Sequence, residues 1–336
     1  MKTVQKMSCL LVLAMLFAVA DVSAMTEVEK KKEVANTFPV SLSDNLLVDN
    51  RYGNVTITHW NRNEVSIRVE IEASAGSEKR VQEILDRINV EIKKSGSTVS
   101  SVTSLASGGV STRNNERFKI SCYVQMPSKL SQRIINKYGN IIFPGENDGK
   151  INVEVGYGNV EGGNFSAALE IDCKYGNARI GNIADGEFDF SYSNLNMENG
   201  NLVELDIKYG NLVAARVQSL EMNMKYGNAT LDYVGSRLQV PELSYSNLKV
   251  RELSAGFSRA ELSARYGGVD IRIADKAAFE LKADNLRYGS ASLTGFTNIN
   301  RNEMEKGSYR GTVNGGGKTI NFNGNSYSNI KVHAIK

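Results

Sequence analysis

The sequence predicts an all-β fold: a right-handed parallel β-helix (β-solenoid) of about ten coils, with one short helix in an N-terminal capping region. Two observations lead to this prediction. A Tyr-Gly-Asn or Tyr-Ser-Asn phrase returns every 17 residues between residues 171 and 229, and apolar residues alternate with polar ones on both sides of each tyrosine. A repeat of 17–22 residues cannot bury its own apolar face, so it must stack on its neighbours. Parallel connections favour the right hand.

Each repeat is centred on a tyrosine. The clearest copies are Tyr138, Tyr157, Tyr175, Tyr192, Tyr209, Tyr226, Tyr245, Tyr266 and Tyr288, with others at Tyr52 and Tyr327 and a weak one at Tyr309. Apolar residues lie four and two positions before the tyrosine, and three and five positions after it, which predicts two short strands. The alternation of apolar and polar residues shifts by one position across Gly-Asn. This shift predicts a corner there, because Gly and Asn tolerate positive φ.

Parity places the tyrosines on the inward side of the coil. We therefore expect a corner ladder in which each ring packs on the ring of the next coil. The alternative is an exposed row of rings that stacks on sugar faces. For the asparagine beside each tyrosine we expect an amide ladder, in which each side chain bonds to the coil above.

Residues 1–24 have the pattern of a signal peptide. Lys2 and Lys6 form a basic start, the stretch 10–20 is apolar, and Val22-Ser23-Ala24 is a small-residue cleavage site. We expect an exported mature chain without a membrane span, placed in the periplasm, at the cell surface or outside the cell.

Residues 25–130 predict an N-terminal coil and a β/α capping region, and residues 131–336 predict the solenoid repeats. Within the capping region, 25–45 is predicted to be a polar leader, 46–57 a first coil and 58–130 a cover over the open strand edges at one end. Ser77 is a candidate helix cap, and alternation predicts strands at 65–71 and 118–126. The Ser/Thr-rich stretch 95–116 predicts a mobile loop, and Gly315-Gly316-Gly317 predicts turns in a final, atypical coil.

Composition narrows the classes of function. The 40 basic and 37 acidic residues nearly balance, which gives no sign of nucleic-acid binding, and no cofactor motif is present. Two histidines, His59 and His333, make a multi-histidine metal site or histidine catalysis unexpected. Cys122 and Cys173 both have inward parity, so they form either two buried thiols or a disulfide. Trp60, the single tryptophan, is expected to cover the core end.

Charged residues obey the same repeat on the outward side. Asp172, Asp189 and Asp206 are expected to stack into an acidic column, with Lys174, Lys208 and Lys225 beside it. Lys137, Arg265 and Arg287 occupy the same repeat position as these lysines. One interpretation is a binding surface, in which the carboxylates could hold Ca²⁺ and a neighbouring base could cleave an acidic polysaccharide. The other is a charge-balanced, solvated sheet.

A resemblance follows from these residues taken together. A short first coil, an amphipathic helix, a strand that ends in Val-Gln-Met-Pro-Ser-Lys-Leu (124–130) and serial Tyr-Gly-Asn repeats resemble the bacterial exported "putative adhesin" β-strand-repeat family of Bacteroidetes type, a domain of unknown function. The resemblance covers nearly all of the mature chain. It implies a right-handed parallel β-helix in the envelope or outside the cell, and it carries over no catalytic residues.

These features favour a non-enzymatic, exported β-solenoid that acts as an adhesin-like binding or scaffold protein of the bacterial envelope. Its expected partner is a glycan or an envelope protein, bound along the column Asp172, Lys174, Asp189, Asp206, Lys208 and Lys225. The alternatives are a polysaccharide-active lyase or hydrolase on the same fold and a purely structural envelope protein. Regularity favours the non-enzymatic interpretation, because a catalytic site breaks a repeat at one place.

Overall fold

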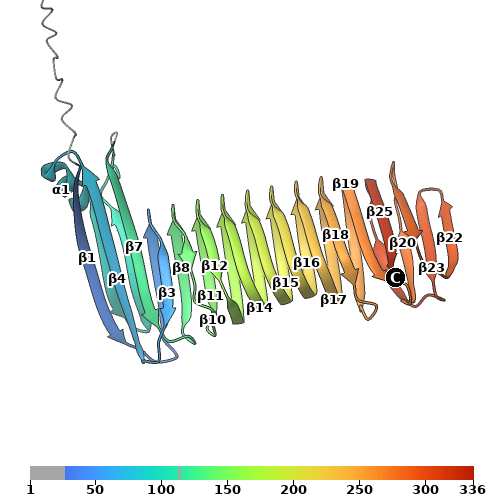
Figure 1. The fold of residues 1–336 in the computed structure, drawn as a ribbon, viewed down its shortest axis with the longest axis horizontal. Coiled ribbons are helices and arrows are strands. Elements are labelled where there is room, and N and C mark those ends of the chain that lie inside the picture. Colours follow the sequence, from blue (N-terminus) through green and yellow to red (C-terminus); the bar gives the residue numbers. More distant parts are fainter. Residues whose placement is uncertain (1–26, 113–114) are drawn as a thin grey trace, which may run out of the picture.

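The computed structural model describes residues 27–112 and 115–336, so the predicted signal peptide lies outside the described residues. The described chain forms one long row of strands with a single helix at one end (Figure 1). The N-terminal elements are β1 (Val28–Pro39), β2 (Asn45–Arg51), β3 (Val55–His59), β4 (Glu64–Ala75), α1 (Glu78–Asp86), β5 (Ile88–Ser95), β6 (Thr98–Leu105), β7 (Arg117–Met126), β8 (Ser131–Lys137), β9 (Ile141–Ile142), β10 (Glu146–Asn147), β11 (Ile151–Gly156) and β12 (Asn159–Gly162). The remaining strands are β13 (Asn164–Lys174), β14 (Asn177–Ser191), β15 (Asn194–Lys208), β16 (Asn211–Lys225), β17 (Asn228–Ser244), β18 (Asn247–Leu253), β19 (Arg259–Ala274), β20 (Phe279–Ala283), β21 (Ser290–Thr294), β22 (Ile299–Glu305), β23 (Ser308–Val313), β24 (Lys318–Phe322) and β25 (Ser326–Ile335).

The central strands β13–β17 pair in parallel, each with the strand one repeat later. Asn177 is opposite Asn194, and Leu195 is opposite Leu212, so the register advances by one 17-residue repeat per strand. This is the pairing that a solenoid requires. The all-β, largely parallel architecture predicted from the repeat is therefore confirmed, while the right-handed winding and the number of coils stay predictions.

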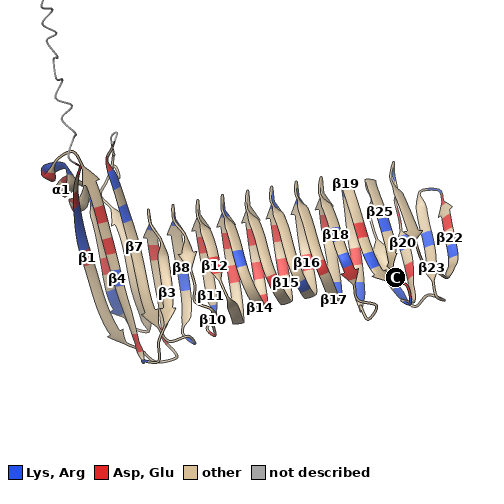
Figure 2. Cartoon of the chain, in the orientation of Figure 1, with Lys and Arg blue, Asp and Glu red and all other residues tan. Residues whose placement is uncertain are grey.

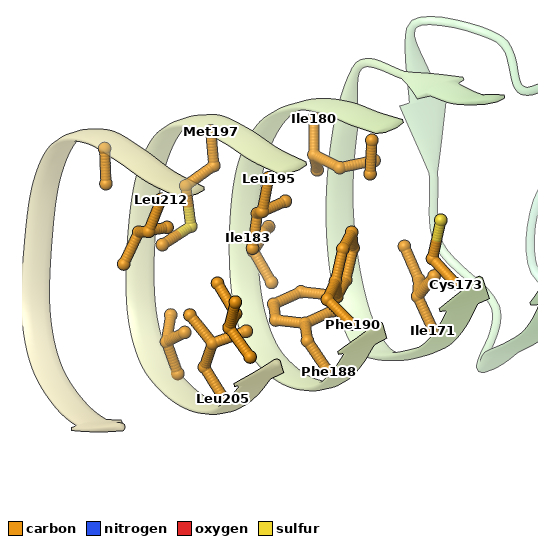
Figure 3. Close-up of a cluster of buried hydrophobic side chains, with 14 of the residues drawn as sticks. Ile171, Cys173, Ile180, Ile183, Phe188, Phe190, Leu195, Met197, Leu205 and Leu212 are labelled. Carbon is orange, nitrogen blue, oxygen red and sulfur yellow. The ribbon is translucent and has the colours of Figure 1, made fainter. Parts of the chain in front are cut away.

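The core lies inside the coils, between the two strand segments of each repeat. Residues predicted to face inward are buried, among them Phe188 and Phe190 before the corner and Leu195 and Met197 after it (Figure 3). Equivalent positions of successive coils stack on one another because the register repeats. Each apolar side chain is therefore covered by the coil on either side, which is how a short repeat buries its apolar face.

At the N-terminal end, β1, β4 and β7 form an antiparallel group beside the parallel row (Figure 1). β7 also pairs in parallel with β3, and α1 begins at Glu78 after the predicted cap Ser77, whose side chain accepts a hydrogen bond from the Arg80 amide. Two local predictions are wrong. Residues 28–39 form strand β1 instead of a leader, and residues 98–105 form strand β6 instead of a loop.

The reason for β6 lies in its short hydroxyl side chains. Thr103 is buried and donates a hydrogen bond of 3.3 Å to the Asn50 Oδ1, so an inward position is filled by a polar group that has a partner. Buried polar groups are tolerated when they are hydrogen-bonded. A pattern search for alternating apolar residues does not find such a strand.

At the C-terminal end, the order of strands departs from the order of the chain. The last strand, β25, lies between β19 and β21, and β24 lies between β19 and β20. The antiparallel hairpin β22–β23 pairs with β20 and stands at the far end of the row (Figure 1). The atypical coil predicted for the C-terminus is therefore not the last coil in space.

Candidate interaction surface

The tyrosine itself makes the corner of each coil. All the repeat tyrosines that form the ladder described below have φ between 50° and 62°, in the left-handed region, whereas the glycine that follows does not. The prediction that Gly-Asn supplies the positive φ is therefore wrong. Where glycine follows the tyrosine it lies close to the backbone of the previous coil: a Cβ on Gly227 would lie 1.8 Å from the Gly210 carbonyl oxygen, although Ser193, Ser246 and Ser328 fill this repeat position in other coils. The glycine column permits the close approach of successive backbones.

The positive φ also changes which way the tyrosines point. Nine of them are 43–55% exposed, and Tyr288 is 82% exposed, so the prediction of inward tyrosines is wrong. A left-handed residue breaks the alternation of a strand, because its side chain leaves the backbone in a direction that strand parity does not describe. Tyr309, predicted to be a weak copy of the repeat, is 3% exposed and lies in β23. It therefore does not occupy a corner position and is not part of the ladder.

The expected ring-on-ring packing is nevertheless confirmed. Successive rings are nearly parallel with centroids 4.7–5.1 Å apart, and we call this array the tyrosine ladder: Tyr52, Tyr138, Tyr157, Tyr175, Tyr192, Tyr209, Tyr226, Tyr245, Tyr266, Tyr327 and Tyr288. Neighbouring rings cover each other's faces, so ring edges and hydroxyl groups form the exposed surface. Tyr288 ends the ladder, with Tyr327 stacked on one side of it.

A ladder of asparagine amides runs beside the tyrosines, as expected. The Asn194 side-chain amide donates to the Asn177 Oδ1 at 2.7 Å, and the Asn211 amide donates to the Asn194 Oδ1 at 2.8 Å. The same pattern joins Asn140, Asn159, Asn228 and Asn247 to their neighbours. These groups satisfy one another, so the asparagines hold the corner in register.

Three rows of outward residues lie on the strand segment that precedes each tyrosine. The first acidic row contains Glu170, Glu187, Glu204 and Glu221, and the second contains Glu154, Asp172, Asp189 and Asp206. The third, next to the tyrosines, is the basic row: Arg51, Lys137, Gly156, Lys174, Ser191, Lys208, Lys225, Ser244, Arg265, Ser326 and Arg287. Figure 2 shows acidic and basic bands recurring across the central strands.

The six residues predicted to form a surface column do lie in these rows, but they are not all paired. Asp172 accepts a bond of 3.0 Å from Lys174, and the pKa of Lys174 is raised by this hydrogen bond. Lys225 pairs instead with Glu242 at 2.9 Å. Asp189, Asp206 and Lys208 form no ion pair within residues 27–112 and 115–336, so the surface is only partly neutralised.

Other candidate groups do not assemble into a chemical site. Among the described residues, no three His, Cys, Asp or Glu side chains are placed to hold a metal ion. Cys122 and Cys173 are both free and buried, and burial raises the pKa of the Cys122 thiol to about 12 and that of Cys173 to about 11. Trp60 donates its indole N–H to the Glu64 carbonyl at 2.8 Å near the N-terminal group.

Comparison with solved structures finds remote similarity. A "putative cell adhesion protein" from Clostridium sporogenes matches at 10% identity and a TM-score of 0.21, over 91% of this chain and 100% of its own. A "putative adhesin" from Bacteroides fragilis matches at 14% identity and 0.35, over 90% and 97%. A "putative lipid binding protein" from Parabacteroides distasonis matches at 12% identity and 0.29, over the same shares. No protein-family model and no curated protein matches the sequence.

These similarities are too remote to carry an activity or a ligand to this chain. In the described part of the chain, no helix has the length and apolar character needed to cross a membrane.

The position of Ser326 in the basic row could not be found from the sequence. Its place depends on the insertion of β25 between β19 and β21, which no repeat spacing reveals. The Tyr327-Ser328-Asn329 phrase marks a corner, but a phrase does not say between which coils it stacks.

Proposed function

We propose that the protein is an exported, non-enzymatic, adhesin-like binding protein of the bacterial envelope. Its binding surface is formed by the tyrosine ladder and the charged rows beside it. The observation that carries this proposal is that the same chemical groups recur in register on the successive strands β13 to β16. A surface of this kind suits an extended partner, whereas catalysis needs one special constellation of groups.

The unpaired charges support the same conclusion. Asp189 and Asp206 are exposed next to each other on neighbouring strands, and Lys208 faces Lys225 in the adjacent coil. Like charges at strand spacing repel each other weakly in water. A partner with complementary charges would relieve this repulsion. The column Asp172, Lys174, Asp189, Asp206, Lys208 and Lys225 is therefore our proposed contact region.

A binding screen tests the proposal. The mature chain, residues 25–336, is applied to a glycan array and used to capture partners from envelope extracts, in parallel with a variant in which Lys174, Lys208 and Lys225 are changed to Glu. We expect specific binding that the triple variant weakens, while its circular dichroism spectrum is unchanged. Cleavage of a polysaccharide during the assay, or an absence of any captured partner, would contradict the proposal.

A further inference from the structure

The basic row has a regular internal pattern. In its C-terminal part the residues run Lys225, Ser244, Arg265, Ser326 and Arg287, so cations alternate with small serines. Adjacent strands lie about 4.8 Å apart, so neighbouring cations in this series are separated by about 9.6 Å. Because the strand order at this end differs from the chain order, the pattern is a property of the fold.

A groove lies along this part of the row. It has a volume of about 480 Å³, and it is lined by the basic-row residues Lys225, Ser244, Arg265 and Ser326, three tyrosines and Glu242. The tyrosines are Tyr226, Tyr245 and Tyr266. The serines make the groove, because their small side chains leave space between the longer cations. Its volume is within the range of small-ligand sites, about 300–1,000 Å³.

The charges of the groove favour an anion. The Lys225 ammonium is occupied by Glu242, whose carboxylate is also bonded by Ser244. Arg265 and Arg287 form no side-chain hydrogen bond or ion pair with any residue that the structure describes. Two exposed guanidinium groups are thus available, and guanidinium binds carboxylate and sulfate groups through paired N–H donors.

The acidic rows contain fewer carboxylates beside the C-terminal part of the basic row. In the second acidic row Asp206 is followed by Asn223 and Glu242, and in the first row Glu221 is followed by Gln239 and Glu261. Lys174, Ser191 and Lys208 repeat the cation–serine–cation pattern, but they lie beside Asp172, Asp189 and Asp206, which would repel an anion. The chain therefore contains two similar segments of the basic row, and the C-terminal one has fewer carboxylates beside it, with Glu242 paired to Lys225.

The tyrosine ladder has its own spacing, which is about half the spacing of the cations. Beside Arg265 and Arg287 the rings of Tyr266, Tyr327 and Tyr288 follow one another at 4.8 and 4.9 Å, so there are two rings for each cation. Their hydroxyl groups and edges can hydrogen-bond to sugar hydroxyls. Tyr288, 82% exposed, adds a ring for stacking at the end of the ladder.

From these two spacings we infer that the segment from Lys225 to Arg287 binds an acidic polysaccharide that carries one anionic group per disaccharide and lies along the ladder. Each sugar ring would be placed beside one tyrosine, and each anionic group beside one cation. This inference rests on the proposed binding function, names the ligand class and extends the contact region from Lys225 to Arg287.

Other polyanions fit this spacing less well. In an extended peptide, side chains on one face recur every second residue, or about 6.8 Å, which does not match cations about 9.6 Å apart. A nucleic acid strand carries a charge about every 3.4 Å of helix axis, which is also too dense. One charge for every two rings is the pattern of an alternating uronate polymer.

The experiment compares matched variants of the mature chain, residues 25–336. Binding of hyaluronate oligosaccharides, which carry one carboxylate per disaccharide, is measured by calorimetry at low and high salt. The test variant is Arg265→Gln with Arg287→Gln, and the control is Lys249→Gln with Lys331→Gln, which removes the same charge from two exposed positions on the strands that follow the tyrosines. Dextran serves as the uncharged probe and polyglutamate as the acidic peptide.

We expect binding to hyaluronate that weakens at least tenfold in the arginine variant and less than threefold in the lysine variant, with no binding to dextran. Circular dichroism shows whether both variants are folded, and Tyr288→Ala, at a mostly exposed ring, provides a second variant with an expected loss of at least threefold. Equal losses in the two double variants, no binding of hyaluronate, or polyglutamate binding of similar strength would overturn the inference. A protein captured from envelope extracts without any glycan binding would overturn it and leave the proposed binding function standing.

Discussion

The tyrosine ladder allows a sharp test of the corner geometry at Tyr209, in the middle of the regular run. Its ring stacks between those of Tyr192 and Tyr226, at 4.7 and 4.8 Å, and is 47% exposed. About half of its surface, roughly 100 Å², is removed from water, which is worth about 2.5 kcal/mol. Two stacked neighbours add about 0.5 kcal/mol or more each. Tyr209→Ala should therefore lower the free energy of unfolding by about 3–4 kcal/mol.

The positive φ predicts an unusual order among substitutions. Tyr209 has a φ of 57°, and a residue with a Cβ costs about 1–2 kcal/mol in this region compared with glycine. Tyr209→Gly should therefore be more stable than Tyr209→Ala by about 1 kcal/mol, although glycine is normally the worse residue in a β-structure. Tyr209→Phe should lie within about 0.5 kcal/mol of the parent protein, because the hydroxyl group contributes no bond to another described residue.

Urea unfolding of residues 25–336, followed by far-ultraviolet circular dichroism, measures all three variants. The slopes of the transitions should agree, so that the midpoints report stability alone. An alanine variant that loses less than about 1 kcal/mol, or a glycine variant less stable than the alanine variant, would refute the reasoning about burial or about backbone strain, respectively.

Three further predictions concern the interior and the corner. Gly227→Ala should lower the free energy of unfolding in urea by more than about 3 kcal/mol, because its Cβ would lie 1.8 Å from a carbonyl oxygen. Gly145→Ala is the control: a Cβ there has no atom within 4 Å, so the change should be less than about 1 kcal/mol. Similar values for the two variants would contradict the argument from close backbone approach. Asn194→Ala should cost about 1–2 kcal/mol because its Oδ1 accepts both the backbone and side-chain N–H groups of the next asparagine, and an unchanged midpoint would show that the amide ladder is replaced by water. A protein of residues 25–336 should not react with a thiol reagent at pH 8 while it is folded, and should react with two equivalents of the reagent after unfolding, because burial raises the pKa values of Cys122 and Cys173 and keeps their reactive thiolates rare. Rapid labelling of the folded protein would show that the thiols are accessible.

Sequence periodicity predicted the inward strand residues well, because alternation is a direct consequence of strand geometry. Phe188, Phe190, Leu195 and Met197 are buried as expected. Periodicity failed at Tyr209 and its equivalents, because parity cannot describe a residue in the left-handed region. It also failed at β6, where hydroxyl groups with hydrogen-bond partners replace apolar residues.

The candidate surface was predictable only in part, for a related reason. The column from Asp172 to Lys225 follows from the 17-residue period, since identical spacing brings equivalent positions into register. The groove beside Arg265 does not follow from it, because Ser326 comes from a strand that is 61 positions further along the chain. The pairing of β25 with β19 depends on how the C-terminal strands are arranged in space. No local sequence pattern predicts such a long-range pairing.

The constant register has a consequence for the evolution of length. Asn177, Asn194 and Asn211 occupy the same position in successive coils, so removing residues 194–210 would join Ser193 to Asn211 and restore an intact corner. The core, the amide ladder and the aromatic stack would each lose one member and close again. Whole coils can thus be gained or lost by recombination between repeats while both capped ends stay unchanged. The length of the row of strands can therefore change in steps of about 4.8 Å per coil without a change of fold.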